Sequence, residues 1–312
     1  MKFRGSASAD LMLVGVTLLA AISWIFSREA VLIMPPLFFM ALRFLLAAVL
    51  LGAFAHRELR QLNAAALRRG VGAGLVFGAG MCLWVMGIFH GTHVGEGAFL
   101  TSLGVVLVPI LAFLVFGEKA PRSTWMALPV AAAGLALLSL KHGFRPEAGQ
   151  LFYLSSAVVF AFYFSLSTRV ANAQSQVSAQ GETVQIAPVP PLALTTVVLF
   201  CVGVMTLLLT IAFEPWQETL QHFRPAMAGW IIISALLGTA ARFLLQTYAQ
   251  SLSPNTNGVV IMVLEPVWVA MLAMLWFGES MGAQQLLGCG LIFAALLINR
   301  AAALRGWLKL IG

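Results

Sequence analysis

Few residues able to bind a charged ligand lie inside the apolar stretches of this 312-residue chain. Glu265 stands directly before Pro266 in VVIMVLEPVWVAMLAMLWF, which is otherwise apolar. If this stretch is a membrane-spanning helix, a charge near its centre costs about 2.5–3.5 kcal/mol on insertion scales and should face a cavity or a partner. Pro266 deprives the carbonyl of Met262 of its usual helical donor. We interpret the pair as a polar notch that binds a substrate ammonium or a proton, although a carboxylate bonded to a neighbouring helix would explain the same residue.

A second polar stripe lies in another apolar stretch. Arg242, Gln246 and Gln250 follow one another at a spacing of four, so they share one face of a helix. Arg242 could bind a substrate carboxylate through two parallel hydrogen bonds, pair with an acidic residue, or extend to the membrane surface. Arg43 is the other cation inside an apolar stretch, and we interpret it mainly as a structural residue with Glu96 as its candidate counter-ion.

Five aromatic residues inside apolar stretches are candidates for contact with a flat substrate. Tryptophan and tyrosine normally gather at the membrane surface, and buried rings can instead stack on an apolar body or hold an ammonium. Core packing is the alternative for each one singly. The candidates are Trp24, Trp84, Phe160, Tyr163 and Trp268.

Two segments, HGTHVGEGAFLTS (90–102) and SPNTNGVVIM (253–262), gather small and polar residues where helices should begin. Free N–H groups and the positive end of the helix dipole attract anions there. Thr101, Ser102 and Asn257 are therefore candidates for contact with a substrate carboxylate, and ordinary helix capping explains them equally well. The sequence carries no set of residues at metal-ligand spacing, so we expect no metal site.

The composition predicts the elements that must hold these residues. Hydrophobic residues make up 61% of the chain and charged residues 9%, and the mean hydropathy is +0.95. A soluble domain is about a quarter charged, and apolar runs of about 20 residues can cross a bilayer as helices. We predict an all-α polytopic membrane protein with ten spans, at roughly 9–28, 36–55, 69–90, 96–116, 122–140, 149–169, 190–213, 226–249, 256–277 and 282–300.

The remaining sequence signals exclude several classes of protein. The first span lacks a small-residue cleavage pattern, so we expect it to stay uncleaved. The polar segment before the seventh span, NAQSQVSAQGETVQIAPVPP, predicts a flexible surface loop. The net charge of +7 is spread over short loops, which argues against nucleic-acid binding. No nucleotide-binding, H-E-x-x-H or G-x-S-x-G motif is present, so we expect neither an enzyme nor a cofactor.

The basic residues predict the orientation of the chain. With ten spans both termini share a side, and twelve Lys or Arg residues fall on that side against four on the other. The excess of basic residues marks the cytoplasmic face. We therefore expect both termini in the cytoplasm.

Two stretches of the chain resemble each other. A shift of 161 residues aligns Phe116–Gly117–Glu118 with Phe277–Gly278–Glu279, and the Pro-Pro-Leu start of the second span echoes that of the seventh. The chain then divides into two five-helix repeats, 1–143 and 144–312. An odd number of helices makes the second copy enter the membrane with opposite polarity. Inverted repeats are typical of secondary transporters that bind substrate near the midplane, where the repeats meet.

These features together resemble the drug/metabolite transporter superfamily, in particular its EamA-type exporters. The resemblance rests on the duplication, the two Gly-Glu pairs, Glu265–Pro266 and Trp24. It is strongest to the bacterial aromatic amino-acid exporters of the YddG type, and it implies efflux of aromatic amino acids and some drug-like cations without ATP. One departure is that Gly104 stands where the second copy has Glu265, and Pro109 lies four residues past the position matching Pro266.

The sequence thus predicts an exporter of a bacterial inner membrane that works by alternating access. We expect Pro109 and Pro266 to act as kinks. The expected substrate is an aromatic or large apolar amino acid, moved down its gradient or against protons. A multidrug or nucleotide-sugar carrier on the same fold is the alternative within transport, and a membrane scaffold or enzyme is the alternative outside it.

Overall fold

A computed structural model describes residues 2–117, 121–140, 147–172, 174–177, 183–252 and 261–299. Up to residue 172, the described part of the chain contains seven helices. They are α1 (Lys2–Ile33), α2 (Pro36–Arg60), α3 (Ala64–His90), α4 (Val94–Ser102), α5 (Gly104–Phe116), α6 (Arg122–Leu140) and α7 (Ala148–Ala171). The fourth expected span is therefore interrupted at Leu103.

The part of the chain after residue 172 contains more interruptions. Its α-helices are α8 (Pro191–Phe213), the short α9 (Trp216–Gln221), α10 (Pro225–Ile233), α11 (Arg242–Leu252), α13 (Glu265–Phe277) and α14 (Ala283–Asn299). A π-helical segment, η1 (Ser234–Ala241), joins α10 to α11, and a 3-10 turn, η2 (Met262–Leu264), precedes α13.

Seven of the described helical segments are long and apolar enough to cross a membrane: Leu11–Ile33, Pro36–Arg60, Ala64–His90, Val94–Phe116, Ala148–Ala171, Pro191–Phe213 and Pro225–Gln246. Met262–Phe277 and Ala283–Asn299 are apolar but shorter. The protein is a multi-pass membrane protein by these lengths and compositions. The count of ten spans stays a prediction.

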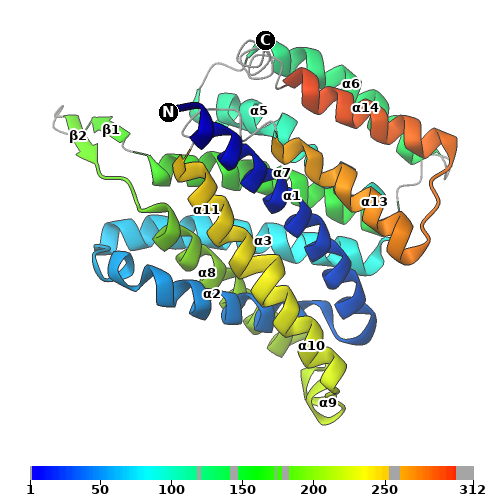
Figure 1. Cartoon of the computed structure of the whole chain (residues 1–312), viewed down its shortest axis with the longest axis horizontal. Coiled ribbons are helices and arrows are strands. Elements are labelled where there is room, and N and C mark those ends of the chain that lie inside the picture. The colour runs from blue at the N-terminus through cyan, green and yellow to red at the C-terminus, as the bar shows by residue number, and fades with distance from the viewer. Residues whose placement is uncertain are drawn as a thin grey trace.

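The polar segment before α8, expected to be a flexible loop, instead contains two short strands, and the other described elements are helices as expected. Strands β1 (Gln174–Val177) and β2 (Thr183–Ile186) form an antiparallel hairpin that projects from one end of the molecule (Figure 1). Both strands end in β-branched residues, which favour extended backbone. The composition signal for a loop missed this short local pairing because it averages over the whole polar segment.

The two aligned stretches have the same local structure. Helices α5 and α13 each have 13 residues and begin at Gly104 and Glu265, the positions that the 161-residue shift aligns. Each ends at the Phe of a Phe-Gly-Glu triplet, and the glycines that follow, Gly117 and Gly278, have φ of 69° and 66°. Glycine adopts this left-handed conformation at helix ends without steric cost.

Carboxylates cap the two Pro-Pro-Leu helix starts reciprocally. Glu214, just after α8, accepts hydrogen bonds from the backbone N–H groups of Leu37 and Phe38 at the start of α2, at 2.8 and 2.7 Å. Glu58, near the end of α2, accepts one from Ala193 N–H at the start of α8, at 3.2 Å. Burial raises the pKa of the Glu214 carboxyl, and the hydrogen bonds that it accepts oppose this rise. Helices α2 and α8 are therefore antiparallel neighbours.

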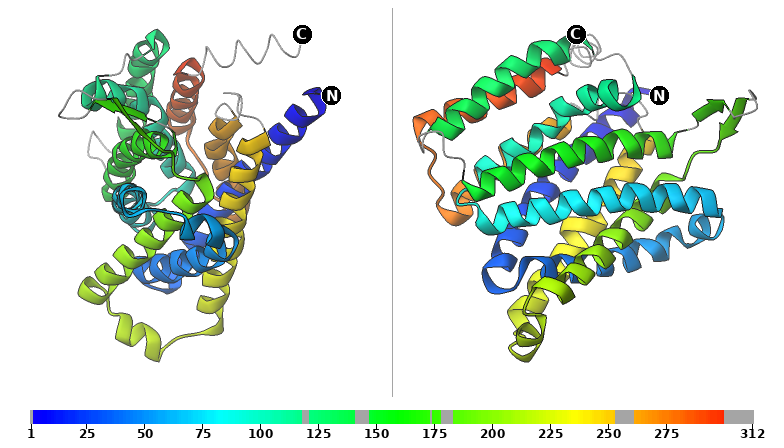
Figure 2. Two further views of the ribbon diagram at one scale, coloured as in Figure 1. Left: turned by 90° about the vertical axis from the view of Figure 1, so that its left-hand side faces the viewer. Right: turned by 180° about the vertical axis from the view of Figure 1, so that it is seen from behind.

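The helices pack in pairs around one apolar core. Helix α2 packs on α8, α6 on α14, and α3 lies against both α7 and α8. Helix α1 crosses the molecule beside α11 and α13, as all the views show (Figure 1, Figure 2). The helices that carry Arg242 and Glu265 thus meet α1, which carries Trp24.

Candidate functional site

Glu265 lies at the first residue of α13, after the 3-10 turn. Pro266 occupies the first turn of this helix, where its missing N–H would have no intrahelical partner. The carbonyl of Met262, which Pro266 leaves without its usual donor, accepts instead from the N–H of Glu265. The break is therefore satisfied within the backbone, and it leaves the Glu265 side chain as the polar feature of this segment.

Two residues from other helices reach the Glu265 carboxylate. The indole Nε1 of Trp24 in α1 donates to Oε1 at 3.2 Å. The Nη2 atom of Arg242 in α11 lies 3.6 Å from Oε2. The side chains of Arg242 and Glu265 are 22% and 23% exposed, so the ion pair is only partly closed off. The structure thus brings together three of the predicted site residues.

Several predicted site residues also carry buried polar atoms without a hydrogen-bond partner among the described residues. They are Arg242 Nε, Gln246 Oε1, Trp268 Nε1 and Thr101 Oγ1, and the only other such atom within the described ranges is Ser234 Oγ. A buried donor or acceptor left unpaired costs about 1–3 kcal/mol. Such atoms are uncommon in native proteins, and binding of a polar ligand is one explanation for them.

The predicted aromatic residues divide into two groups. Trp24 contacts Trp84 edge to face, with ring centroids 4.8 Å apart, and Tyr153 lies 5.8 Å from Trp24 on another side. Phe160 and Tyr163 instead pack on Phe77, at 5.5 and 4.4 Å. Tyr153 was not among the predicted residues, because it is buried inside α7 and carries no charge or spacing that marks it in the sequence.

Phe160 has a packing role. A Cβ on Gly80 of α3 would lie 2.6 Å from Cε1 of Phe160, so the ring fills the space that this glycine leaves between α3 and α7. This contact favours the core-packing interpretation of Phe160. Asn257 lies outside the described residues, and so does the side chain of Gln250. The roles of all these residues in binding stay predictions.

The expected pairing of Arg43 with Glu96 is wrong. Arg43 is buried, and its hydrogen bonds go to α1 and η1. Glu96 in α4 accepts from Gln150 Nε2 at 2.5 Å and from Gln285 Nε2 at 3.1 Å. The Oε1 atom of Gln150 accepts from its own helix start, the N–H of Glu147, which turns its Nε2 toward Glu96. The sequence could not reveal this partner choice because the two glutamines come from distant helices.

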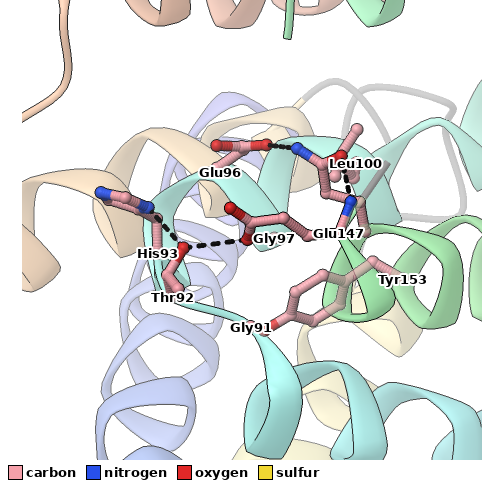
Figure 3. A pocket seen from close by; sticks show the side chains of 9 residues that line it. Gly91, Thr92, His93, Glu96, Gly97, Leu100, Glu147 and Tyr153 are labelled. Carbon is pink, nitrogen blue, oxygen red and sulfur yellow. Dashed lines mark hydrogen bonds between the residues drawn. The ribbon is translucent and has the colours of Figure 1, made fainter. Parts of the chain in front are cut away.

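A small cavity adjoins Glu96. Figure 3 shows Thr92, His93, Glu147 and Tyr153 around it, with the Thr92 hydroxyl bonded to His93 and Glu147. Its volume of about 10 Å³ suits a single water molecule. A larger, apolar cavity of about 380 Å³ lies between α2, α8 and α9. None of the predicted site residues lines either cavity, and we place the candidate site at Glu265, where the charged pair and the unpaired Nε atom of Arg242 occur.

The sequence profile of a known family matches this chain twice. The EamA-like transporter family profile covers residues 7–140 and 147–301, which is most of the chain. The chain belongs to the EamA-like transporter family. The partly exposed ion pair and the aromatic cluster therefore lie inside a member of a transporter family.

Two curated relatives carry the name of transporter. The chain is 28% identical over 278 residues to "Uncharacterized transporter YwfM" from Bacillus subtilis (strain 168), covering 86% of this chain and 85% of that protein. It is 23% identical over 290 residues to an "Uncharacterized transporter" from Archaeoglobus fulgidus, covering 93% and 85%. A solved crystal structure with 18% identity matches with a TM-score of 0.63 over 96% of this chain and 98% of its own. That last likeness supports the fold.

Proposed function

We propose that this EamA-family protein is a secondary transporter that exports aromatic or large apolar amino acids from a bacterial cell across the inner membrane. The observation that carries the proposal is the partly exposed Arg242–Glu265 pair beside Trp24. An amino acid carries one cation and one anion on a single carbon, and this pair offers one partner of each sign. A zwitterion that enters can exchange the protein ion pair for two new ones.

The aromatic residues would receive the apolar side chain of the substrate. Trp24 donates to Glu265 and contacts Trp84, so the acidic group adjoins an aromatic surface. Trp268 lies one helical turn after Glu265, and its indole N–H is buried without a partner among the described residues. Aromatic pairs contribute about 0.5–1.5 kcal/mol beyond the burial of their area, so a ring in the substrate would be favoured over an aliphatic chain.

The charges of the site disfavour the alternative substrate class. A nucleotide sugar brings phosphate groups, and phosphate recognition normally uses several cations or backbone N–H groups. Among the described residues, Arg242 is the cation that contacts Glu265, and the hydroxyls of neighbouring helices engage Arg43. One arginine beside one carboxylate fits a zwitterion better than a polyanion.

Counterflow of labelled tryptophan into proteoliposomes tests the proposal. Vesicles loaded with unlabelled tryptophan should take up label, and phenylalanine or tyrosine outside should suppress the uptake. A nucleotide sugar and a lipophilic cation serve as the competitors that the alternatives predict. Folded protein that moves no amino acid would overturn the substrate assignment. Suppression by the nucleotide sugar alone would favour a carrier of that class, and failure with every compound would favour a membrane scaffold.

A further inference from the structure

Arg43 is a cation buried in α2 that has no acidic partner among the described residues. It is 3% exposed. No carboxylate of the described residues lies within 4.0 Å of its guanidinium. All the polar atoms that it bonds are neutral: Thr239 Oγ1 at 2.8 Å, Ser27 Oγ at 2.7 Å, Ser23 Oγ at 2.5 Å and, more weakly, Gly238 O at 3.4 Å. An intramembrane charge is expensive, and such residues usually mark a function.

The partners of Arg43 flank the residues that reach Glu265. Ser23 and Ser27 lie on α1 on either side of Trp24, and Thr239 lies three residues before Arg242. Arg43 therefore joins α1 to the segment that leads into α11. Trp24 and Arg242 then meet on the two oxygens of one carboxylate. Two charged side chains therefore bridge α1 and the segment that contains η1 and α11. Arg43 bonds to both of them, and the Glu265 carboxylate contacts both of them.

The segment η1, to which Arg43 donates a hydrogen bond, is π-helical. Thr239 Oγ1 donates to the carbonyl of Ser234, five residues back, at 3.1 Å, and accepts from Arg43 Nε. Segments of π-helix are rare and occur often at functional sites. The wider turn changes the direction in which the next residues point, and Arg242 is the first residue after it.

A glycine allows α1 to approach this segment closely. A Cβ on Gly238 would lie 2.8 Å from Ser23 Oγ and 2.9 Å from Ser23 Cβ, which is too near for either atom. The backbone of η1 and the side chain of Ser23 are therefore in direct contact, and the guanidinium of Arg43 covers that contact.

We propose that Arg43 is a positioning residue that holds α1 against η1, so that Trp24 and Arg242 converge on Glu265. That it thereby sets the affinity for substrate rests on the function proposed above. The contact between α1 and η1 that Arg43 maintains does not depend on which substrate is carried.

If Arg43 only positions the helices, its removal should leave the stability of the protein unchanged, whereas removal of a purely stabilising residue should lower it. Ser27 Oγ also donates to the Ser23 carbonyl at 2.6 Å, and Thr239 Oγ1 donates to Ser234. These hydroxyls keep a hydrogen bond when the guanidinium is removed. Loss of a buried charge that leaves no opposite charge behind need not destabilise a protein. Removal of Arg43 should therefore impair substrate binding without lowering stability.

The first test compares Arg43→Met and Arg43→Lys with the wild-type protein in tryptophan counterflow. We expect Arg43→Met to raise the half-saturation concentration at least tenfold, with an unchanged or higher melting temperature. Arg43→Lys keeps the charge but cannot reach both helices at once, so it should not restore the wild-type value. Arg224→Met, at an exposed arginine before α10, is the matched control. An unchanged half-saturation concentration in Arg43→Met, or a loss of transport that follows a loss of stability, would overturn the proposal.

The second test measures how closely α1 and α11 approach each other, and it does not require transport. A Cβ on Gly15 of α1 would lie 3.9 Å from Cδ2 of Leu245 in α11, so Gly15→Cys and Leu245→Cys should be linked by a short thiol-reactive crosslinker. The native Cys82, Cys201 and Cys289 are replaced by serine or alanine first. We expect Arg43→Met to reduce the crosslinking yield at least threefold, and an unchanged yield refutes the positioning role. A reduced yield in a protein that carries no amino acid supports the positioning role and refutes the proposed substrate.

Discussion

At the scale of single residues, the two stretches that we interpret as copies of a repeat differ at the position of Glu265. The second copy has Glu265, which receives a hydrogen bond from Trp24 and faces Arg242. The first copy has Gly104, where a Cβ would lie 2.8 Å from the carbonyl oxygen of Ala157 in α7. Close packing of α5 on α7 leaves no room for a side chain there. A carboxylate fits in only one copy, which makes the candidate site asymmetric.

Replacement of Glu265 by glutamine isolates the role of its charge. Glutamine keeps an oxygen for the Trp24 indole, but it cannot neutralise Arg242 or a substrate ammonium. A hydrogen bond to a charged group contributes about 1.5–3 kcal/mol, so we expect Glu265→Gln to reduce tryptophan counterflow roughly tenfold to a hundredfold. The measurement is initial uptake at a substrate concentration below half-saturation.

The matched control for this change is Glu218→Gln, at an exposed carboxylate of α9 far along the chain from the site. It should transport as the wild type does. Wild-type uptake by Glu265→Gln would remove the carboxylate from the binding site. A change in thermal stability alone would agree with a scaffold.

At the scale of elements, the sequence predicted helices well and their interruptions poorly. The Phe-Gly-Glu triplets marked the ends of α5 and α13, because a glycine after an apolar run is a strong helix stop. The helix α5 continues through Pro109, so the kink expected there stays a prediction, and the interruption of this span lies at Leu103. The carbonyl of Val105, which Pro109 leaves without its helical donor, accepts from Asn299 Nδ2 at 3.1 Å. A partner 194 residues away cannot be read from local sequence.

The π-helical segment η1 and the two glutamines that bond to Glu96 were likewise not predicted, because they depend on contacts between distant helices. Arg43 selects its hydroxyl partners through the packing of α1, α2 and η1, and no spacing in the sequence encodes that contact. The predicted candidates Trp24, Arg242 and Glu265 stood out because polar residues are rare in apolar stretches. Which of them touch is a property of the assembled helices.

The two helix-ending glycines give a prediction at this scale. Alanine at Gly117 or Gly278 would have to adopt a positive φ, which costs about 1–2 kcal/mol. We expect Gly117→Ala and Gly278→Ala each to lower the melting temperature in detergent by a similar amount. Gly229→Ala, inside α10 with open space around its Cβ position, should raise it because alanine favours a helix by up to about 1 kcal/mol. Equal behaviour of all three variants would contradict this account.

At the scale of the whole molecule, the reciprocal caps tie the two halves into one unit. Glu58 in the first half accepts from the start of α8 in the second half. Glu214 in the second half accepts from the start of α2 in the first half. An antiparallel pair is the arrangement in which both caps can form, since each helix then ends where the other begins. The same arrangement follows from two five-helix repeats of opposite polarity, which stays our interpretation of the duplication.

The orientation of the chain can be measured directly. We expect the α8–α10 connection to face outward and the α2–α3 connection to face the cytoplasm. In a variant without native cysteines, Glu218→Cys should react with a membrane-impermeant maleimide in intact cells, whereas Gln61→Cys should react only after the membrane is opened. The reverse pattern would place both termini outside.

The cap on α2 also bears on how the protein is synthesised. Leu37 and Glu214 are separated by 177 residues, so at about 5–20 residues per second the ribosome needs roughly 10–35 s to deliver the capping carboxylate. During that interval the first N–H groups of α2 have no protein acceptor of this kind and must be hydrated, since hydrocarbon offers none. The start of α2 is therefore expected to stay hydrated at the membrane surface until α8 has been made. Completion of this cap on the second helix depends on synthesis of the seventh expected span.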